Sequence, residues 1–409
     1  MRSTPSANPA RCIRSAACRA TGSRSAWNVR RRSTLSTLRI AIFAPYDLAR
    51  PGGVTTHVRA QARALRARGH DVAIFGPASG ALPDGERALS SAISITFGGT
   101  ESGLGLDPLS ARRVAHVLHR ERFDIVHVHE PLTPLVPWFA LRSSRAPIVG
   151  TFHVHREAGH RLYPVARPLL QRLIARVSAR VAVSEAARDT VAAHFPGEYV
   201  IVPNGVDVDA FRRPQPRPPA LADGRRHVVF VGRLEARKGV EHLVAAMPRV
   251  CARHAGARLV VVGDGGARAA LESSARALSV DAQFVGAVGD ADLPAYFQWA
   301  DIVCSPATGG ESFGMVLVEA LACGTPIVAT RIDGYRALVG GEGCGRLVAP
   351  GDAGALSAAL CELLDDDEER RRCGARGLAV ARAYDWSVIA GRLESIYEAA
   401  RDSRSDRAR

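Results

Sequence analysis

The chain has 409 residues and a formal net charge of +14, and 47% of its residues are hydrophobic. This length predicts two domains, and the composition is sufficient for two hydrophobic cores. No run of about 18 or more apolar residues is present, so no transmembrane helix is predicted. The cysteines form no Cys-x-x-Cys pair, which indicates reduced thiols and argues against a disulfide framework or a cysteine zinc site.

Much of the positive charge lies at the N-terminus. Residues 1–39 contain nine Arg and no acidic residue, so the remainder of the chain carries only about +5. Such a mildly basic body gives little support to nucleic-acid binding. Residues 1–37 lack an apolar segment and are therefore not a secretory signal. We expect a disordered Arg/Ser-rich leader there, with a tether to an anionic surface and a start codon assigned too far upstream as alternatives.

Apolar strands and helical stretches alternate from residue 38 to residue 205. A helix is expected from about Val54 to Arg68, after a Pro-Gly-Gly turn. Near-continuous apolar strands separated by helices are typical of a parallel sheet covered on both faces, which predicts an N-terminal Rossmann-like domain. The expected strands are Leu38–Phe43, Asp71–Phe75, Ile125–His129, Ile148–Phe152, Arg180–Val183 and Val200–Val202.

A second alternation of the same kind follows residues 206–226, whose Pro/Arg-rich part from Arg212 predicts a stiff, exposed linker. It predicts a C-terminal Rossmann-like domain over residues 227–385. An amphipathic helix from Trp386 to Ala400 is expected to pack back on the first domain. The predicted fold is thus α/β, with two tandem doubly wound domains and a cleft between them. The expected strands are His227–Val231, Arg258–Val262, Ala282–Val285, Ile302–Cys304, Ile327–Ala329 and Arg346–Val348.

Lys238 is the only lysine of the chain, and it follows Arg233 in a basic turn after the strand that ends at Val231. Open α/β sheets bind ligands at the carboxyl edge of their strands, so this position suits a bound anion. The compact ammonium group is not equivalent to a guanidinium at a phosphate. The alternative is that a codon bias towards Arg spared one Lys by chance.

A second signal is the run from Gly309 to Ala320, in which a glycine-rich turn leads into a helix. Free backbone N–H groups at the start of a helix favour an anion. Glu311 and Glu319 lie eight positions apart in this run. If the whole segment were helical, they would be separated by about 12 Å along the axis and would bind two parts of one elongated ligand. Alternatively, Glu311 is a solvated loop acid and Glu319 a carboxylate at the edge of the core.

These two motifs resemble those of retaining nucleotide-sugar glycosyltransferases of the GT-B fold, in the large glycogen-synthase-like family. The resemblance extends from Leu38 to Ala400. Further runs look like the bacterial phosphatidylinositol mannosyltransferase branch, namely Pro51–Val54, His127–Pro131, Thr151–His153, Pro203–Asp207 and Tyr384–Ser387.

The resemblance implies roles on the donor side. Arg233 and Lys238 would neutralise the leaving diphosphate, Glu311 would hold the transferred sugar, and His153 would lie near the anomeric carbon; a structural histidine is the alternative for His153. These four residues are the expected catalytic group. The expected donor-binding residues are Gly53, Arg233, Lys238, Val288, Glu311, Ser312, Phe313, Gly314 and Glu319.

The acceptor side follows the resemblance less closely. Tyr46, Asp47, Thr55 and Arg237 are expected to bind the acceptor, although Ala49-Arg50 stands where the branch has an acidic residue before Pro-Gly-Gly. The helical segment 111–120 carries three Arg and two His. It predicts either contact with an anionic membrane or an ordinary solvated face.

The predicted function is transfer of a hexose with retention, with mannose from GDP-mannose as the expected donor and phosphatidylinositol or a related glycolipid as the expected acceptor. The reaction is expected to need no metal and no cofactor. The Asp207-x-Asp209 pair begins at the end of the run Pro203–Asp207 at the domain boundary, and it is interpreted as hinge structure and not as a metal motif. The predicted location is the cytoplasm, with peripheral attachment to the inner face of the plasma membrane left open; the oligomeric state is unknown.

Three alternatives remain open. The first is a glycosyltransferase that uses a UDP-sugar or another nucleotide sugar on a polysaccharide or small-molecule acceptor. The second is a phosphorylase with pyridoxal phosphate on Lys238, and the third is a sugar-nucleotide-binding protein without turnover.

Overall fold

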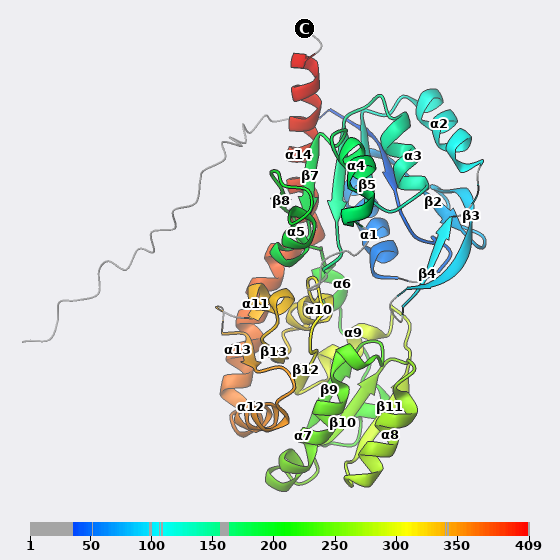
Figure 1. Ribbon diagram of the computed structural model, residues 1–409. Helices are drawn as coiled ribbons and strands as arrows, with labels where there is room; N and C mark the ends of the chain where they lie inside the picture. The colour runs from blue at the N-terminus through cyan, green and yellow to red at the C-terminus, as the bar shows by residue number, and fades with distance from the viewer. Residues whose placement is uncertain are drawn as a thin grey trace, which may run out of the picture. The chain divides into compact units, whose positions relative to one another are not determined.

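The computed structural model describes residues 36–407 except 51, 98–99, 106, 108, 156–162, 340 and 342. Nearly all of the predicted leader and Pro51 of the Pro-Gly-Gly turn therefore lie outside the described residues. Two sheets with helices on their faces make up the described chain (Figure 1). No helix among the described residues combines the length and the apolar character that a membrane span needs.

The first sheet has eight strands in the order β4-β3-β2-β1-β5-β6-β7-β8. All neighbours are parallel except β3 and β4, which form an antiparallel pair at one edge. These two strands were not among the predicted ones, because they lack the continuous apolar run of a strand that is buried on both faces. The strands are β1 Arg39–Phe43, β2 Asp71–Ala78, β3 Glu86–Phe97, β4 Thr100–Gly105, β5 Ile125–His129, β6 Ile148–Phe152, β7 Ala179–Ala182 and β8 Val200–Ile201.

Helices cover both faces of this sheet. Ile40 and Ile42 of β1 face a core shared with α1 and α14, whereas Ala41 and Phe43 face a core shared with α2, α3 and α4. This alternation follows from the two-residue period of a strand. The helices of this part are α1 Gly53–Ala67, α2 Ser110–Glu121, α3 Val136–Ser143, α4 Tyr163–Ile174, α5 Glu185–Ala192 and α6 Val208–Arg212.

The second sheet has six parallel strands in the order β11-β10-β9-β12-β13-β14. The chain moves outward in one direction from β9 and in the other direction from β12, so these neighbouring strands form the topological switch point where open α/β sheets bind ligands. The strands are β9 His227–Val231, β10 Arg258–Val262, β11 Ala282–Gly286, β12 Ile302–Ser305, β13 Ile327–Thr330 and β14 Gly345–Val348.

Two hydrophobic cores lie on the two faces of this sheet. One contains residues of α10 and the other contains residues of α7 and α12. The helices are α7 Val240–Arg253, α8 Arg268–Ala277, α9 Leu293–Gln298, α10 Met315–Cys323, α11 Asp333–Val339, α12 Ala353–Asp365 and α13 Asp367–Ala381, with short 3-10 turns η1 Pro219–Leu221, η2 Ala236–Lys238 and η3 Arg382–Tyr384.

The Pro/Arg-rich segment between the sheets is not simply the exposed linker that its composition predicts. Leu221 is fully buried. The side-chain amide of Gln298 donates to the carbonyls of Phe211 and Arg213, each at 2.7 Å. The apolar residues among the prolines therefore fix this segment against α9 and the second sheet.

The last helix, α14 Trp386–Arg407, contacts α1 of the first sheet. The buried carboxylate of Glu394 accepts two hydrogen bonds from Arg68, at 2.6 and 2.7 Å, and lies 2.9 Å from His70. The Tyr397 hydroxyl reaches further in and lies 2.6 Å from His127 Nδ1 on β5. The C-terminal helix is thus part of the framework around the central strand of the first sheet.

Candidate active site

The loop that follows β9 carries the predicted cations. Arg233 is exposed and pairs with Glu235 at 2.9 Å, whereas the ammonium group of Lys238 is largely covered and lies 2.8 Å from Glu311 Oε1. Arg237 also contacts Glu311 and lies 3.0 Å from Glu235. Three cations and two carboxylates thus form one network at the switch point, with an excess of one positive charge.

Close backbone packing fixes this loop against the loop that follows β12. Gly239 has φ +65°, and a Cβ there would lie 2.1 Å from the carbonyl oxygen of Pro306. The backbone N–H of Thr308 donates to the carbonyl of Arg237 at 2.9 Å. Only glycine combines this backbone conformation with so close a contact. The position of Lys238 is therefore set by the fold of both loops.

Glu311 and Glu319 do not share one helix, as the simplest interpretation of their spacing assumed. α10 begins at Met315, after Gly314 in the left-handed conformation with φ +89°. A Cβ at Gly314 would lie 2.7 Å from the ring of Tyr335, so this turn is also specific for glycine. Glu311 is consequently a loop residue that faces Lys238, and Glu319 lies on the second turn of a short helix.

Glu319 is half-buried, and no hydrogen bond or ion pair reaches it from the described residues. Burial, with a smaller contribution from Asp290, raises the pKa of its carboxyl to about 7. A half-buried carboxyl with a raised pKa at this edge of the sheet is suited to bind ligand hydroxyls. Phe313 is buried and contacts the ring of Tyr384, while Ser312 and Val288 are half-buried.

At the switch point of the first sheet, α1 starts at Gly53 directly after the loop that follows β1. Its N-terminus has no side-chain cap and no acidic residue in the first turn, and a Cβ at Gly53 would meet no protein atom within 4 Å. Free N–H groups and open space favour an anion at this point. Thr55 is buried in the first turn of this helix.

The predicted acceptor residues come from several elements of the fold. Tyr46 is half-buried in the loop after β1. Asp47 is buried there, and its Oδ1 accepts backbone hydrogen bonds from Ala49 at 2.9 Å and from Ser79 at 3.0 Å. This carboxylate therefore holds its own loop. Arg237 belongs to the charged network of the second sheet.

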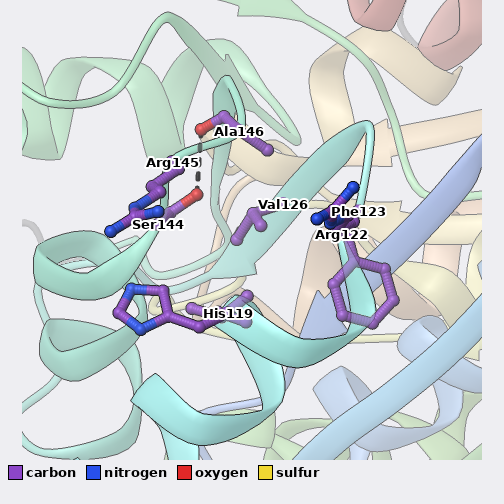
Figure 2. A pocket seen from close by; sticks show the side chains of 8 residues that line it. His119, Arg122, Phe123, Val126, Ser144, Arg145 and Ala146 are labelled. Carbon is purple, nitrogen blue, oxygen red and sulfur yellow. Dashed lines mark hydrogen bonds between the residues drawn. The ribbon is translucent and has the colours of Figure 1, made fainter.

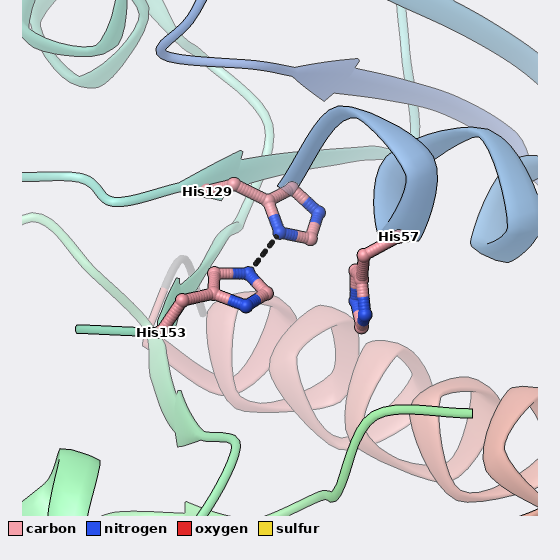
Figure 3. Close-up of side chains that lie close together, drawn as sticks. All are labelled: His57, His129 and His153. Carbon is pink, nitrogen blue, oxygen red and sulfur yellow. Dashed lines mark hydrogen bonds between the residues drawn. The ribbon is translucent and has the colours of Figure 1, made fainter. Parts of the chain in front are cut away.

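His153 follows β6 and lies in a group of four histidines. His129 Nδ1 lies 2.8 Å from His153 Nε2, and the ring of His57 from α1 lies edge-on to both, with centroids at 5.3 and 4.8 Å (Figure 3). His127 stacks on His129 with ring centroids 4.5 Å apart. His127 and His129 are two residues apart on β5, so their side chains lie on the same face of the sheet.

The sequence analysis gave no role to His57 or to the two histidines of β5. A signal was available, because two histidines inside an otherwise apolar central strand are unusual for a strand buried on both faces. Their closeness to His153 depends on the pairing of β5 with β6, which places His129 opposite Thr151.

Glu130 positions the backbone of His153. It directly follows β5 with φ +45°, which is uncommon for a residue other than glycine. Its Oε1 accepts hydrogen bonds from the backbone N–H groups of His153 and Val154, the latter at 3.0 Å. Such an uncommon conformation persists only where its surroundings enforce it, and here it aims a carboxylate at the loop that carries His153.

Burial keeps the histidine group uncharged. It lowers the pKa of His57 to about 4 and that of His127 to about 3, and it moves the pKa of His129 and His153 well below the usual range. The neighbouring imidazoles lower the pKa values of His127, His129 and His153 further. At neutral pH, therefore, His153 is a neutral imidazole that can donate or accept a hydrogen bond, and it does not act as a fixed cation.

A separate pocket of about 400 Å³ lies at the C-terminal end of α2, the predicted basic helix (Figure 2). Its apolar wall includes Leu118 and Phe123, and the side chains of His119, Arg122 and Arg145 line it as well. Elsewhere on the helix, Arg113 pairs with Asp107 at 2.8 Å. Both interpretations of this helix, membrane contact and solvated face, therefore remain predictions.

Comparison with known proteins assigns the two parts of the chain. Residues 51–210 match the family described as Glycosyltransferase Family 4, and residues 211–379 match the Glycosyl transferases group 1. The chain is 38% identical over 372 residues to the phosphatidyl-myo-inositol mannosyltransferase of Mycobacterium tuberculosis, covering 88% of this chain and 97% of the relative. It is 30% identical over 395 residues to a glycogen synthase of the same species, covering 86% and 92%.

Among solved structures, the sucrose-phosphate synthase of Thermosynechococcus elongatus matches with a TM-score of 0.69 and 22% identity. The match covers 88% of this chain and 98% of the other. At this level of identity the likeness concerns the fold alone, and it confirms the predicted fold class.

Proposed function

Because the chain belongs to the family of GT-B glycosyltransferases that includes the phosphatidyl-myo-inositol mannosyltransferases, we propose that it transfers mannose from GDP-mannose to the inositol ring of phosphatidylinositol with retention of configuration. The chain is a hexosyltransferase. The observation that carries the choice of acceptor is the 38% identity over nearly the whole length of a relative with that name.

In this proposal the donor binds at the switch point of the second sheet. Arg233 and Lys238 neutralise the diphosphate as it leaves, and the N–H groups of Phe313 and Gly314 bind its oxygens. Electrostatic stabilisation of this kind is usually the largest single contribution to catalysis. The charged network of Lys238 and Glu311 supports these roles, since a ligand oxygen can take over contacts that the two side chains now make with each other.

The remaining donor contacts are those that the family resemblance implies. Glu311 binds hydroxyls of the mannose and Glu319 binds the ribose hydroxyls, while the backbone of Val288 contacts the base and Ser312 lines the site. The N–H of Gly53 approaches the pyrophosphate from the start of α1, where open space and free N–H groups support such a contact.

The reaction breaks the bond between the anomeric carbon and the diphosphate oxygen and forms a bond from that carbon to an inositol oxygen on the same face. The proton of the inositol hydroxyl passes to the departing phosphate oxygen. His153 is placed to orient the reacting hydroxyl groups, with Tyr46, Thr55 and Arg237 on the acceptor side. No metal and no cofactor takes part in these steps.

The acceptor is a membrane lipid, so the enzyme works as a peripheral protein at the cytoplasmic face of the membrane. The exposed basic residues of α2 and the pocket beside them support contact with an anionic surface.

The test is release of GDP from GDP-mannose by the full chain, with and without phosphatidylinositol vesicles, in the presence of EDTA. Phosphatidylcholine vesicles are the control for a surface without the acceptor. The proposal predicts GDP release that requires phosphatidylinositol and survives EDTA, with mannose recovered on the lipid. Release at the same rate with both kinds of vesicle would contradict it.

A second candidate is transfer from another nucleotide sugar to a polysaccharide, which the 30% identity to a glycogen synthase favours. The same assay distinguishes it when UDP-glucose or ADP-glucose and an α-glucan replace GDP-mannose and the vesicles.

A further inference from the structure

Three of the four histidines bring one nitrogen each to a common point. The nitrogens of His57, His129 and His153 lie within 4.8 Å of one another, and the group contains no carboxylate and no thiol (Figure 3). The three side chains come from separate elements, namely α1, the end of β5 and the segment after β6. The fold thus positions each of them independently, and Trp386 closes the far side of the His57 ring at a centroid distance of 5.0 Å.

His129 Nε2 is buried without a hydrogen-bond partner among the described residues, whereas the ring of His57 interacts with the side chains of Gln61 and Asn204. Buried polar atoms are normally satisfied, so an unpartnered atom calls for an explanation such as a bound ion. The unpartnered nitrogen of His129, whose ring lies next to the rings of His57 and His153, therefore points to a ligand within this group.

His127 does not belong to this set, although its ring stacks on His129. Its Nδ1 lies 2.6 Å from the Tyr397 hydroxyl, and its Nε2 lies 2.7 Å from Thr151 Oγ1. Both nitrogens are thus occupied, and the ring serves as a packed wall behind His129. These hydrogen bonds indicate that His127 has a structural role and has no free nitrogen with which to bind a ligand.

We propose that His57, His129 and His153 form a binding site for a divalent transition metal, with Zn²⁺ as the expected ion. Imidazole nitrogens suit Zn²⁺, Cu²⁺ and Ni²⁺, whereas Mg²⁺ and Ca²⁺ prefer oxygen ligands. Three histidines with a fourth position open to water are a common coordination set for Zn²⁺.

The geometry requires only small movements. Nitrogens bound to one Zn²⁺ at about 2.0–2.1 Å in a tetrahedral arrangement lie about 3.3 Å apart. The largest separation in the group is 4.8 Å, so rotation of the side chains by up to about 1.5 Å at the nitrogens closes the site.

The ion would inhibit the enzyme. Zn²⁺ would take up an imidazole nitrogen of His153, the residue that orients the reacting hydroxyl groups in the proposed function, so we expect occupancy of the site and turnover to exclude each other. This second half of the proposal rests on the proposed function, whereas the binding of the metal does not. We expect the bound ion to leave the donor contacts of Lys238 and Glu311 unaffected, because those residues belong to the second sheet.

The experiment uses the full chain without a histidine tag, stripped with EDTA and desalted. Binding of ZnCl₂ is measured by calorimetry, and the visible absorption of added Co²⁺ reports tetrahedral coordination. His57→Ala and His129→Ala remove one ligand each. His155→Ala is the matched control, because His155 is a nearby half-buried histidine whose Nδ1 lies 3.2 Å from the carbonyl of Ala186 and from Thr190.

We expect one Zn²⁺ per chain in the wild-type protein and in His155→Ala, and binding weakened at least about tenfold in the other two variants. Zn²⁺ should also raise the melting temperature of the wild type and not that of His57→Ala, which shows that the loss is local and not a failure to fold. Equal zinc affinity in all four proteins, or no binding by the wild type, would overturn the site.

Inhibition by Zn²⁺ is tested by measuring the rate of mannose transfer and the affinity for GDP-mannose, each with and without Zn²⁺. We expect Zn²⁺ to abolish transfer, EDTA to restore it, and the donor affinity to stay the same. Transfer that continues at full zinc occupancy would overturn inhibition. Absence of transfer from the metal-free protein would instead overturn the proposed function, while the metal site would stand on its binding data.

Discussion

The two switch points of this enzyme use different physical chemistry. At the second sheet, Lys238, Arg233 and Arg237 meet two carboxylates in a charged network, part of which faces solvent. At the first sheet, four histidines are packed against one another and kept uncharged by burial. A charged edge suits the binding of a diphosphate, whereas a buried neutral group suits the orientation of hydroxyl groups during transfer. The difference predicts which step each region controls.

Removal of the ammonium group should have the largest effect. We expect Lys238→Met to lower kcat/KM by about 10²–10³, the range found when one donor to a developing oxyanion is lost. Lys238→Arg should recover only part of this, because the two cations differ in shape and hydration. The measurement is steady-state kinetics with GDP-mannose, and Arg276→Met on the exposed end of α8 is the control. Full activity of Lys238→Met would contradict the role of the charged network in binding the diphosphate.

His129 should act on turnover and not on donor binding. Its Nδ1 lies 2.8 Å from His153, so His129→Phe leaves His153 without this partner. We expect kcat to fall by about 10-fold to 10²-fold, the cost of a small misplacement of a reacting group, with an unchanged KM for GDP-mannose. His155→Phe provides the comparison. A higher KM with the wild-type kcat would assign His129 to the donor site instead.

Glu319 should make the stability of the free enzyme depend on pH. Its folded-state pKa of about 7 lies above the usual range of a glutamate, so the fold favours the neutral carboxyl. The contribution is present at low pH and is lost as the pH rises through about 7. The melting temperature of the wild type should therefore fall relative to Glu319→Gln as the pH rises from about 5 to 8. A difference in melting temperature between the two proteins that stays constant from about pH 5 to pH 8 would show that Glu319 is already ionised in the free protein.

The smallest effect concerns the framework behind the histidines. Tyr397→Phe removes a hydroxyl that lies 2.6 Å from His127 Nδ1 and accepts a hydrogen bond from Gln61 Nε2 at 3.1 Å. Gln61 Nε2 stays 2.9 Å from His127 Nδ1, so the net loss is about one hydrogen bond. We expect a loss of about 1 kcal/mol in the free energy of unfolding, the usual net value of one hydrogen bond. Urea denaturation measures it. A loss of about 3 kcal/mol or more would mean that Tyr397 anchors α14 and does not merely satisfy His127.

The two regions also differ in how far the sequence predicts them. Lys238 and Glu311 lie in two short motifs that each follow one strand, so local patterns predicted their place at the carboxyl edge of the second sheet, where they lie 2.8 Å apart. The start of α10 at Met315 was not predicted, because the left-handed turn at Gly314 is packed against the ring of Tyr335, which lies in another element. Tertiary contacts of this kind leave no local pattern.

The histidine group was predicted only in part. His153 came from a resemblance, while His57 and His129 lie far from it in sequence and are brought near by the strand order β1-β5-β6. The edge strand β4 and its neighbour β3 were missed for a related reason, since strands at this end of the sheet need no continuous apolar run. Strand order and edge pairing are properties of the whole sheet, and local sequence patterns do not predict them.

The most direct test of the division between the two regions is the affinity for GDP-mannose of His153→Ala and Lys238→Ala, measured by calorimetry beside the transfer rate of each. The division predicts that His153→Ala binds the donor like the wild type and transfers mannose at least about 10²-fold more slowly, whereas Lys238→Ala loses donor affinity as well. Equal loss of donor affinity in both variants, or normal transfer by His153→Ala, would contradict it.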